Sequence, residues 1–296
     1  MPYDVFALAA AACWAFGSLL SVEASRHLGA FSYTRWRMLL VAVMLWATTL
    51  VLNGVQTPSF THFGTMALSG LIGIFIGDTA LFSAMNRLGP RRAGILFATH
   101  AIFSALLGFA VFGERMSAQA LAGAALTISG VMIAILFGQR KTDNHAWETN
   151  QGHPGIGIVL GLVAALGQAL GTLVAKPAMA DGMDPVEASA IRVSVACAAH
   201  FCLLWFGVKV AQPARRPTLP VLIQTGLSGL VSVALGMTLL LLALKRGDVG
   251  MVAILSSVTP ILLLPLLWLR LRRVPAKGAW CGAAITVIGT ALILSR

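Results

Sequence analysis

The sequence has few charged residues for its length. Only 10% of its 296 residues are Asp, Glu, Lys or Arg, whereas 58% are apolar, and the mean hydropathy is +0.86. A typical soluble domain has about 25% charged residues, and so few charges could not cover a surface that faces water. The composition therefore excludes an ordinary soluble protein and indicates that lipid surrounds most of the chain.

Cysteine is also scarce, and its four positions are typical of packing residues. Cys13, Cys197, Cys202 and Cys281 all lie in apolar segments, where a free thiol packs as a small hydrophobic group. His200 stands between Cys197 and Cys202, but this spacing matches no zinc pattern and no second ligand pair follows. We predict no metal site and no cofactor.

The short motifs of catalysis are absent. The sequence contains no Gly-x-Ser-x-Gly elbow, no His-Glu-x-x-His helix, no phosphate-binding loop and no paired carboxylates at a useful spacing. Gly155, Gly157 and Gly161 open an apolar span and follow no strand, so they are not a nucleotide fingerprint. We predict no catalytic residues; a membrane-embedded enzyme acting on lipid-linked substrates is the alternative from another functional class.

Basic residues outnumber acidic ones, 21 to 10, and give a formal net charge of +11. They stand in short clusters between apolar runs, such as Arg91-Arg92, Arg215-Arg216 and Arg270 to Arg273. Nucleic-acid binding would need a contiguous basic face on a soluble domain, so it is excluded. Basic clusters beside a membrane contact anionic lipid headgroups, which makes the lipid bilayer the expected partner.

Apolar runs long enough to cross a membrane occupy most of the chain. A spanning helix needs about 20 apolar residues. Ten segments fit this length: 4–22, 31–52, 63–85, 93–112, 117–137, 155–179, 186–207, 219–243, 249–270 and 276–294. The first run lacks a basic segment and a cleavage site, so we interpret it as a retained helix. The predicted fold is an all-α integral membrane protein.

The two halves of the chain are similar to each other in a fixed register. A shift of 159 residues places Ser69-Gly70-Leu71 on Ser228-Gly229-Leu230, and Arg87 on Arg246. Apolar composition does not explain glycines and an arginine that keep register without a gap. Because five crossings are an odd number, the second copy enters the membrane from the opposite side. The pattern predicts two inverted five-helix repeats around a central cavity, the arrangement of many transporters.

The repeat divides the chain into three parts. We predict a first repeat at 1–138, a polar cytoplasmic linker at 139–153 and the inverted second repeat at 154–296. In this topology 15 of the 21 Lys and Arg residues fall on the linker side, and the richer side is normally cytoplasmic. Both termini are therefore predicted outside the inner (plasma) membrane. A complete cavity within one chain predicts a monomer.

The whole chain resembles the drug/metabolite transporter superfamily, EamA type. The resemblance rests on the ten spans in two halves, the turn Phe112-Gly113-Glu114-Arg115-Met116-Ser117 and the following helix with Gly123 and Gly130. The chain is most similar to the YddG-like branch, bacterial exporters of aromatic and other neutral amino acids. The resemblance implies export of such amino acids by alternating access, with proton-coupled efflux of cationic drugs as the alternative. The second half departs from the turn, with Arg272-Arg273 in place of Gly113-Glu114.

Polar side chains within the spans are the candidates for substrate binding, because they are costly in lipid. Asp78 lies inside the third span. In a functional role it would titrate or attract a substrate ammonium; the alternative is a buried carboxyl hydrogen-bonded to Thr79 or to a neighbouring helix. His100 has Phe97 and Phe103 three residues to either side, which places the three on one helix face. An aromatic face with one polar group suits a cavity for an apolar side chain; ordinary packing is the alternative.

In the second half the equivalent of His100-Ala101 is Thr259-Pro260. Pro260 removes a helix hydrogen bond, which predicts a free carbonyl near Ser256 and, with Ser256, Ser257 and Thr259, a site for an amino or carboxyl group. The predicted substrate-binding residues are Trp14, Asp78, Phe82, Phe97, His100, Phe103, Gln168, Ser256, Thr259 and Pro260.

Three further features have structural interpretations. Gly73/Gly77 and Gly167/Gly171 are each spaced four apart, which permits close helix approach. Glu114 is expected to form a loop ion pair with Arg115 or to start a helix. Lys176 and Arg192 are expected to be solvated near the outer mouth.

Overall fold

Ten apolar helices long enough to cross a membrane form the protein, which confirms the predicted number of spans. The computed structural model describes residues 2–53, 59–137, 154–271 and 276–295, and among these no strand occurs. The predicted linker, 139–153, lies outside the described residues. The first half comprises α1 (Pro2–Leu28), α2 (Ala30–Asn53), α3 (Phe60–Gly70), a π-helical segment η1 (Leu71–Asp78), α4 (Thr79–Leu88), α5 (Pro90–Ala98), α6 (His100–Phe112) and α7 (Ala118–Phe137).

The second half has the same order of elements. It comprises α8 (Pro154–Ala180), α9 (Pro185–Trp205), a short 3-10 turn η3 (Lys209–Ala211), α10 (Leu219–Gly229), a π-helical segment η4 (Leu230–Leu235), α11 (Gly236–Leu244), α12 (Val249–Ser256), α13 (Thr259–Leu271) and α14 (Lys277–Leu294). In each half, three consecutive elements form the third span and two form the fourth.

Irregularities in the helices occur at equivalent positions of the two halves. The π-helical segments of the third spans begin at Leu71 and Leu230, which are 159 residues apart. The fourth spans break at Thr99 and at Ser257–Val258. Shared departures from regular geometry are more specific than shared apolar composition, and they confirm the repeat. Because π-helical turns are frequent at functional sites, they also direct attention to the third spans.

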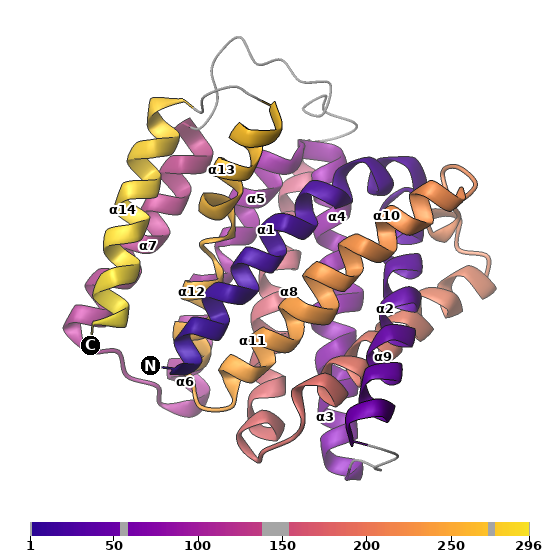
Figure 1. The fold of residues 1–296 in the computed structure, drawn as a ribbon, viewed down its shortest axis with the longest axis horizontal. Coiled ribbons are helices and arrows are strands. Elements are labelled where there is room, and N and C mark those ends of the chain that lie inside the picture. The colour runs from indigo at the N-terminus through magenta and orange to yellow at the C-terminus, as the bar shows by residue number, and fades with distance from the viewer. Residues whose placement is uncertain (1, 54–58, 138–153, 272–275, 296) are drawn as a thin grey trace.

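Packing interleaves the two repeats. The first helix of each half packs against the third span of the other: α1 against α10, η4 and α11, and α8 against α3, η1 and α4. Equivalent helices also pair across the pseudo-twofold axis, α2 with α9 and α7 with α14. Figure 1 shows α7 and α14 side by side at one edge of the bundle.

Small residues permit the closest crossings. A Cβ atom on Gly282 would lie 2.5 Å from the carbonyl oxygen of Gly130, so α7 and α14 touch backbone to backbone. A Cβ on Gly171 of α8 would lie 2.7 Å from the Cα of Gly73 on η1. The predicted close approach through spaced glycines is therefore correct.

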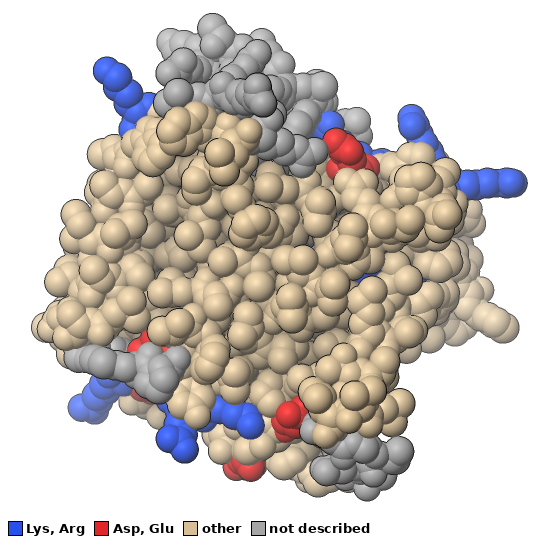
Figure 2. All heavy atoms as spheres, viewed as in Figure 1, with Lys and Arg blue, Asp and Glu red and all other residues tan. Residues whose placement is uncertain are grey.

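The bundle has two polar ends, which we call the terminal face and the linker face. Both termini and the turn between α6 and α7 lie at the terminal face, and the end of α7 and the start of α8 lie at the linker face (Figure 1). Figure 2 shows a broad band with few Lys, Arg, Asp or Glu side chains, between charged side chains that gather near these two ends. This distribution is the one expected for a protein whose waist contacts lipid.

Candidate substrate site

The interrupted fourth span of the second half places Ser256, Thr259 and Pro260 at a helix break. Pro260 has no N–H for the carbonyl of Ser256, but the hydroxyl of Thr259 donates to that oxygen at 2.9 Å. The prediction of a free carbonyl is therefore wrong, because the preceding side chain replaces the missing backbone donor. Thr259 and Pro260 are half-buried, whereas Ser256 is buried.

The serine hydroxyls at this break also bond to their own helix. Ser256 Oγ donates to the carbonyl of Ala253 at 3.0 Å, and Ser257 Oγ donates to that of Ile254 at 2.7 Å. A hydroxyl has a single proton, so these groups retain only lone pairs. They can accept a hydrogen bond from a substrate N–H, but they offer no donor to a carboxylate.

The first-half break separates the predicted aromatic face into two parts. Phe97 lies in the last turn of α5 and His100 begins α6, with Thr99 between the helices. Phe97, His100 and Phe103 therefore do not share one continuous helix. The rings of Phe97 and His100 nevertheless stay in contact, with centroids 5.0 Å apart. His100 is buried, its Nδ1 has no hydrogen-bond partner among the described residues, and Phe103 is half-buried one turn further on.

Trp14 and Gln168 lie on the first helices of the two repeats, α1 and α8. The indole N–H of Trp14 donates to the carbonyl of Ser232 in η4 at 2.9 Å. Gln168 is buried, and its backbone passes beside Gly77 at the end of η1. α1 also packs against α12 and α13, and α8 against α5 and α6. The predicted residues thus form two pseudo-symmetric groups, one around each first helix.

Asp78 is paired within the protein. Its Oδ2 accepts from Arg37 Nη2 of α2 at 2.5 Å, and the guanidinium lies 4.8 Å from the ring centroid of Phe82 and 5.3 Å from that of Tyr33. Thr79 contacts His200 Nε2 at 3.0 Å. The neighbouring-helix alternative for Asp78 therefore fits the geometry, and Phe82 packs on the ion pair.

Comparisons with known proteins agree with this architecture. The model of the EamA-like transporter family matches residues 1–136 and 155–295. The chain belongs to the EamA-like transporter family. A solved crystal structure shares the fold, with a TM-score of 0.78 over 98% of this chain and 96% of that chain at 19% sequence identity. A search of curated protein sequences found no match. As an EamA-like transporter, the chain is a multi-pass membrane protein that moves small molecules.

The sequence did not identify Arg192 as a buried residue of this EamA-like transporter. Arg192 is fully buried in α9, so the expectation of a solvated residue was wrong. The equivalence of Arg192 to Arg37 can be found by aligning the starts of their helices. Arg37 lies seven residues after the first residue of α2, and Arg192 lies seven residues after the first residue of α9. The 159-residue shift conceals this equivalence, because the second spans are related by a shift of 155.

The fourth spans of the two halves meet at the terminal face. α6 packs against α12 there, and the carboxylate of Glu114 accepts from the N–H groups of Val249 at 2.8 Å and Gly250 at 3.2 Å. Glu114 thus caps a helix of the other repeat, which is neither of the roles expected for it. Lys176 is likewise engaged, donating to the carbonyls of Leu244 and Gly247 at 2.9 and 2.7 Å. At the linker face no contact of comparable extent joins α5 to α13 among the described residues.

Proposed function

We propose that this EamA-like transporter exports neutral and aromatic amino acids by alternating access. The observation that carries the proposal is the asymmetry of the fourth spans. α6 and α12 pack extensively at the terminal face, whereas their equivalents α13 and α5 make no contact of comparable extent at the linker face in the part of the chain that the structure describes. Inverted repeats can exchange conformations, so the opposite arrangement is a second state of the same fold. Exchange between the two states gives access from each side in turn.

The side chains near the breaks favour an apolar or aromatic substrate. Phe97, Phe103 and Trp14 are half-buried, so part of each ring remains accessible. Aromatic rings with a few polar groups are typical of pockets that hold an apolar side chain. Their charge-free surface is suited to phenylalanine or leucine more than to a polar metabolite.

The pairing of Asp78 weighs against efflux of cationic drugs. An acid that attracts a cationic drug within the membrane must be free of an internal cation, and Asp78 has Arg37 at 2.5 Å. A drug would have to displace a guanidinium held by both a carboxylate and two aromatic rings. Drug efflux is therefore the second candidate, and it would require Asp78→Asn to abolish transport.

The direction of export follows from the predicted orientation. With the linker face in the cytoplasm of the inner membrane, the described conformer is the one that accepts cytoplasmic substrate, and the terminal face opens to release it. We expect one chain to perform the cycle, since both repeats contribute to each fourth-span pair.

Counterflow in proteoliposomes tests the proposal. Labelled phenylalanine is placed outside, and unlabelled phenylalanine, threonine or a cationic dye is trapped inside without an ion gradient. Accumulation driven by trapped phenylalanine supports the proposal. No accumulation with or without a pH gradient, together with dye efflux, refutes it in favour of drug export.

A further inference from the structure

Arg192 is a fully buried cation within the bundle. It belongs to α9, and none of its surface is exposed. A buried charge in a membrane protein is costly unless a counter-charge or a full set of hydrogen bonds offsets the cost. The first question is therefore which groups the guanidinium contacts.

Arg192 and Arg37 occupy equivalent environments. A Cβ on Gly70 would clash with the backbone of Arg192, and a Cβ on Gly229, the equivalent glycine, would lie 3.1 Å from Cγ of Arg37. Each arginine thus crosses a glycine of the other repeat. Each then directs its guanidinium to the same position of its own repeat, which is Asp78 for Arg37 and Met237 for Arg192.

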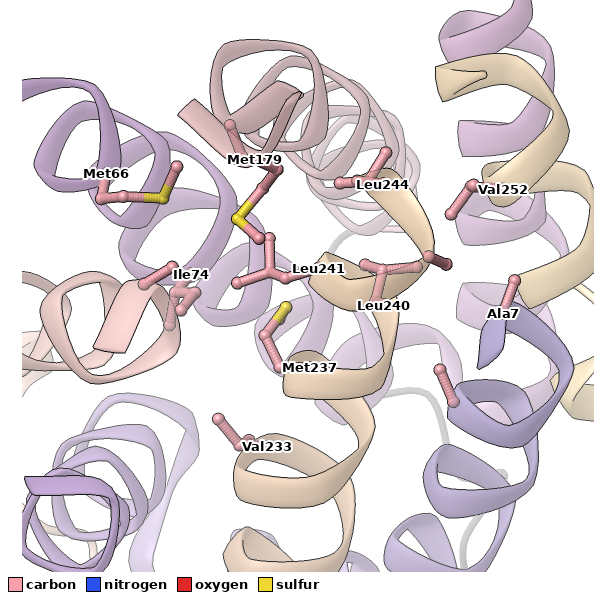
Figure 3. Packing of buried hydrophobic residues seen from close by; sticks show 14 of the residues in the cluster. Ala7, Met66, Ile74, Met179, Val233, Met237, Leu240, Leu241, Leu244 and Val252 are labelled. Carbon is pink, nitrogen blue, oxygen red and sulfur yellow. The ribbon is translucent and has the colours of Figure 1, made fainter. Parts of the chain in front are cut away.

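The two arginines differ in the group they meet. Arg37 meets a carboxylate, whereas Nη1 of Arg192 donates to the thioether sulfur of Met237 at 3.2 Å. Thioether sulfur is a weak acceptor and carries no charge. Nε and Nη2 of Arg192 have no hydrogen-bond partner among the described residues. In Figure 3 Met237 lies in the apolar cluster that includes Ile74, Leu241 and Met179.

Arg37, Arg192 and Asp78 together carry one net positive charge. Asp78 is the acidic group that acts electrostatically on Arg192. Arg192 therefore has a carboxylate within electrostatic range, but that carboxylate is bonded to Arg37. A single additional anion would neutralise the cluster and supply acceptors to Arg192.

The unpartnered side of Arg192 lies beside the crossing of η1 and α8, near Gln168 of the candidate substrate site. A Cβ on Gly73 would lie 3.2 Å from Nη2, so this buried group lies against the backbone of η1, where a side chain would crowd it. Gly73 is also where η1 crosses α8 at Gly171, one turn from Gln168. Separation of η1 from α8 during the transport cycle would expose Nη2 to a molecule held in the site.

We propose that Arg192 binds the carboxylate of the transported substrate. This inference rests on the proposed function and identifies the feature shared by its substrates. Guanidinium and carboxylate form short, charge-assisted hydrogen bonds with matching geometry. The hydroxyls of Ser256, Ser257 and Thr259 and the indole N–H of Trp14 already donate within the protein, so they do not compete for this carboxylate.

The most direct test introduces a carboxylate beside Arg192, equivalent to the one that Asp78 provides for Arg37. Met237→Asp places a carboxylate at the position equivalent to Asp78, and Met237→Asn is the matched control, since it has nearly the same shape without the charge. Purified in detergent, Met237→Asp is expected to melt at a higher temperature than Met237→Asn. It should lose the thermal stabilisation that 3-phenylpropanoate gives the wild type, with affinity about ten- to hundredfold weaker.

The substrate-free comparison and the ligand comparison separate the possible outcomes. The inference is overturned if folded Met237→Asp binds 3-phenylpropanoate as tightly as the wild type. It is also overturned by a wild type that no carboxylate stabilises, or by one that is stabilised equally by phenethylamine, which lacks the carboxylate.

A second arm distinguishes this inference from the proposed function. If phenylalanine counterflow is absent in the wild type but 3-phenylpropanoate stabilises it and not Met237→Asp, the amino-acid proposal fails and the carboxylate site stands. If the wild type transports phenylalanine and Met237→Asp transports it equally well, the function stands and the role of Arg192 is refuted. Arg192→Lys keeps the charge without the planar fork, and it should retain partial binding if the carboxylate contact is real.

Discussion

Glu114 connects the two repeats at the terminal face, and its removal is expected to loosen that face. The Glu114 carboxylate takes the two N–H groups at the start of α12, a position that the side chain of Asp248 does not cap. Gly108 makes room for the contact, since a Cβ there would collide with the Glu114 carboxylate. Substituting Glu114 by Gln keeps the size of the side chain and removes its charge.

The size of the effect follows from the two contacts. A hydrogen bond to a charged group contributes about 1.5–3 kcal/mol, and a negative charge at a helix N-terminus adds about 0.3–1 kcal/mol. The amide introduced by Glu114→Gln would retain one acceptor oxygen, so the loss should be close to one charged hydrogen bond. Since 1.4 kcal/mol is about a tenfold change in an equilibrium, Glu114→Gln should raise the population that is open at the terminal face by about ten- to hundredfold.

Cysteine accessibility measures this population. Met251 is fully buried on α12, and Met251→Cys in a background without the four native cysteines reports opening at the terminal face. An impermeant thiol reagent should modify it at least about tenfold faster in Glu114→Gln. Asp181→Asn is the matched control, because it removes a carboxylate that is exposed at the end of α8. Equal rates in Glu114→Gln and in the parent would refute the role of Glu114 as a latch.

Three further outcomes are expected. Asp78→Asn leaves Arg37 buried without its counter-ion, so the thermal stability of the purified protein should fall by the equivalent of about 3–5 kcal/mol; an unchanged melting curve would show that the pair contributes nothing. Gly282→Val places a branched side chain against the backbone of Gly130 and Ala134, and we expect loss of monodisperse protein in size-exclusion chromatography, whereas Ala283→Val, beside it on α14, should be tolerated. Lys209→Cys should resist an impermeant reagent added outside intact cells; labelling from outside would reverse the predicted orientation.

Much of the fold could be predicted because lipid restricts the possibilities. Backbone groups in a bilayer must bond within the chain, so apolar runs of sufficient length become helices, and all ten predicted spans are present. The loss of a backbone hydrogen bond at Pro260 was also predicted, because proline has no N–H, and the fourth span of the second half breaks just before it. The break at Thr99 carries no such local signal, and only its equivalence to Val258 under the 159-residue shift indicates it.

The contacts of the polar residues were harder to predict, because they depend on which helices meet. Asp78 was identified as a candidate by its depth in the span, but its partner on α2 follows from tertiary packing and not from spacing. Arg192 was misplaced for the same reason: near the end of a span, a solvated arginine and a buried one look alike in sequence. The Thr259 hydroxyl that occupies the carbonyl of Ser256 shows a further limit, since a side chain can satisfy the group that proline leaves free.

The contact of Glu114 at the terminal face has no counterpart in the sequence at the linker face, and in the proposed alternating-access cycle this difference would favour one of the two states. Under the shift of 159, Glu114 corresponds to Arg273, while Val249 and Gly250 correspond to Pro90 and Arg91. Proline has no N–H to donate, and two arginines repel each other, so the same contact cannot close the linker face. The empty transporter should therefore rest with its terminal face shut. Closing the linker face then requires free energy from bound substrate, and a substrate carboxylate that neutralises Arg192 is a group able to supply it.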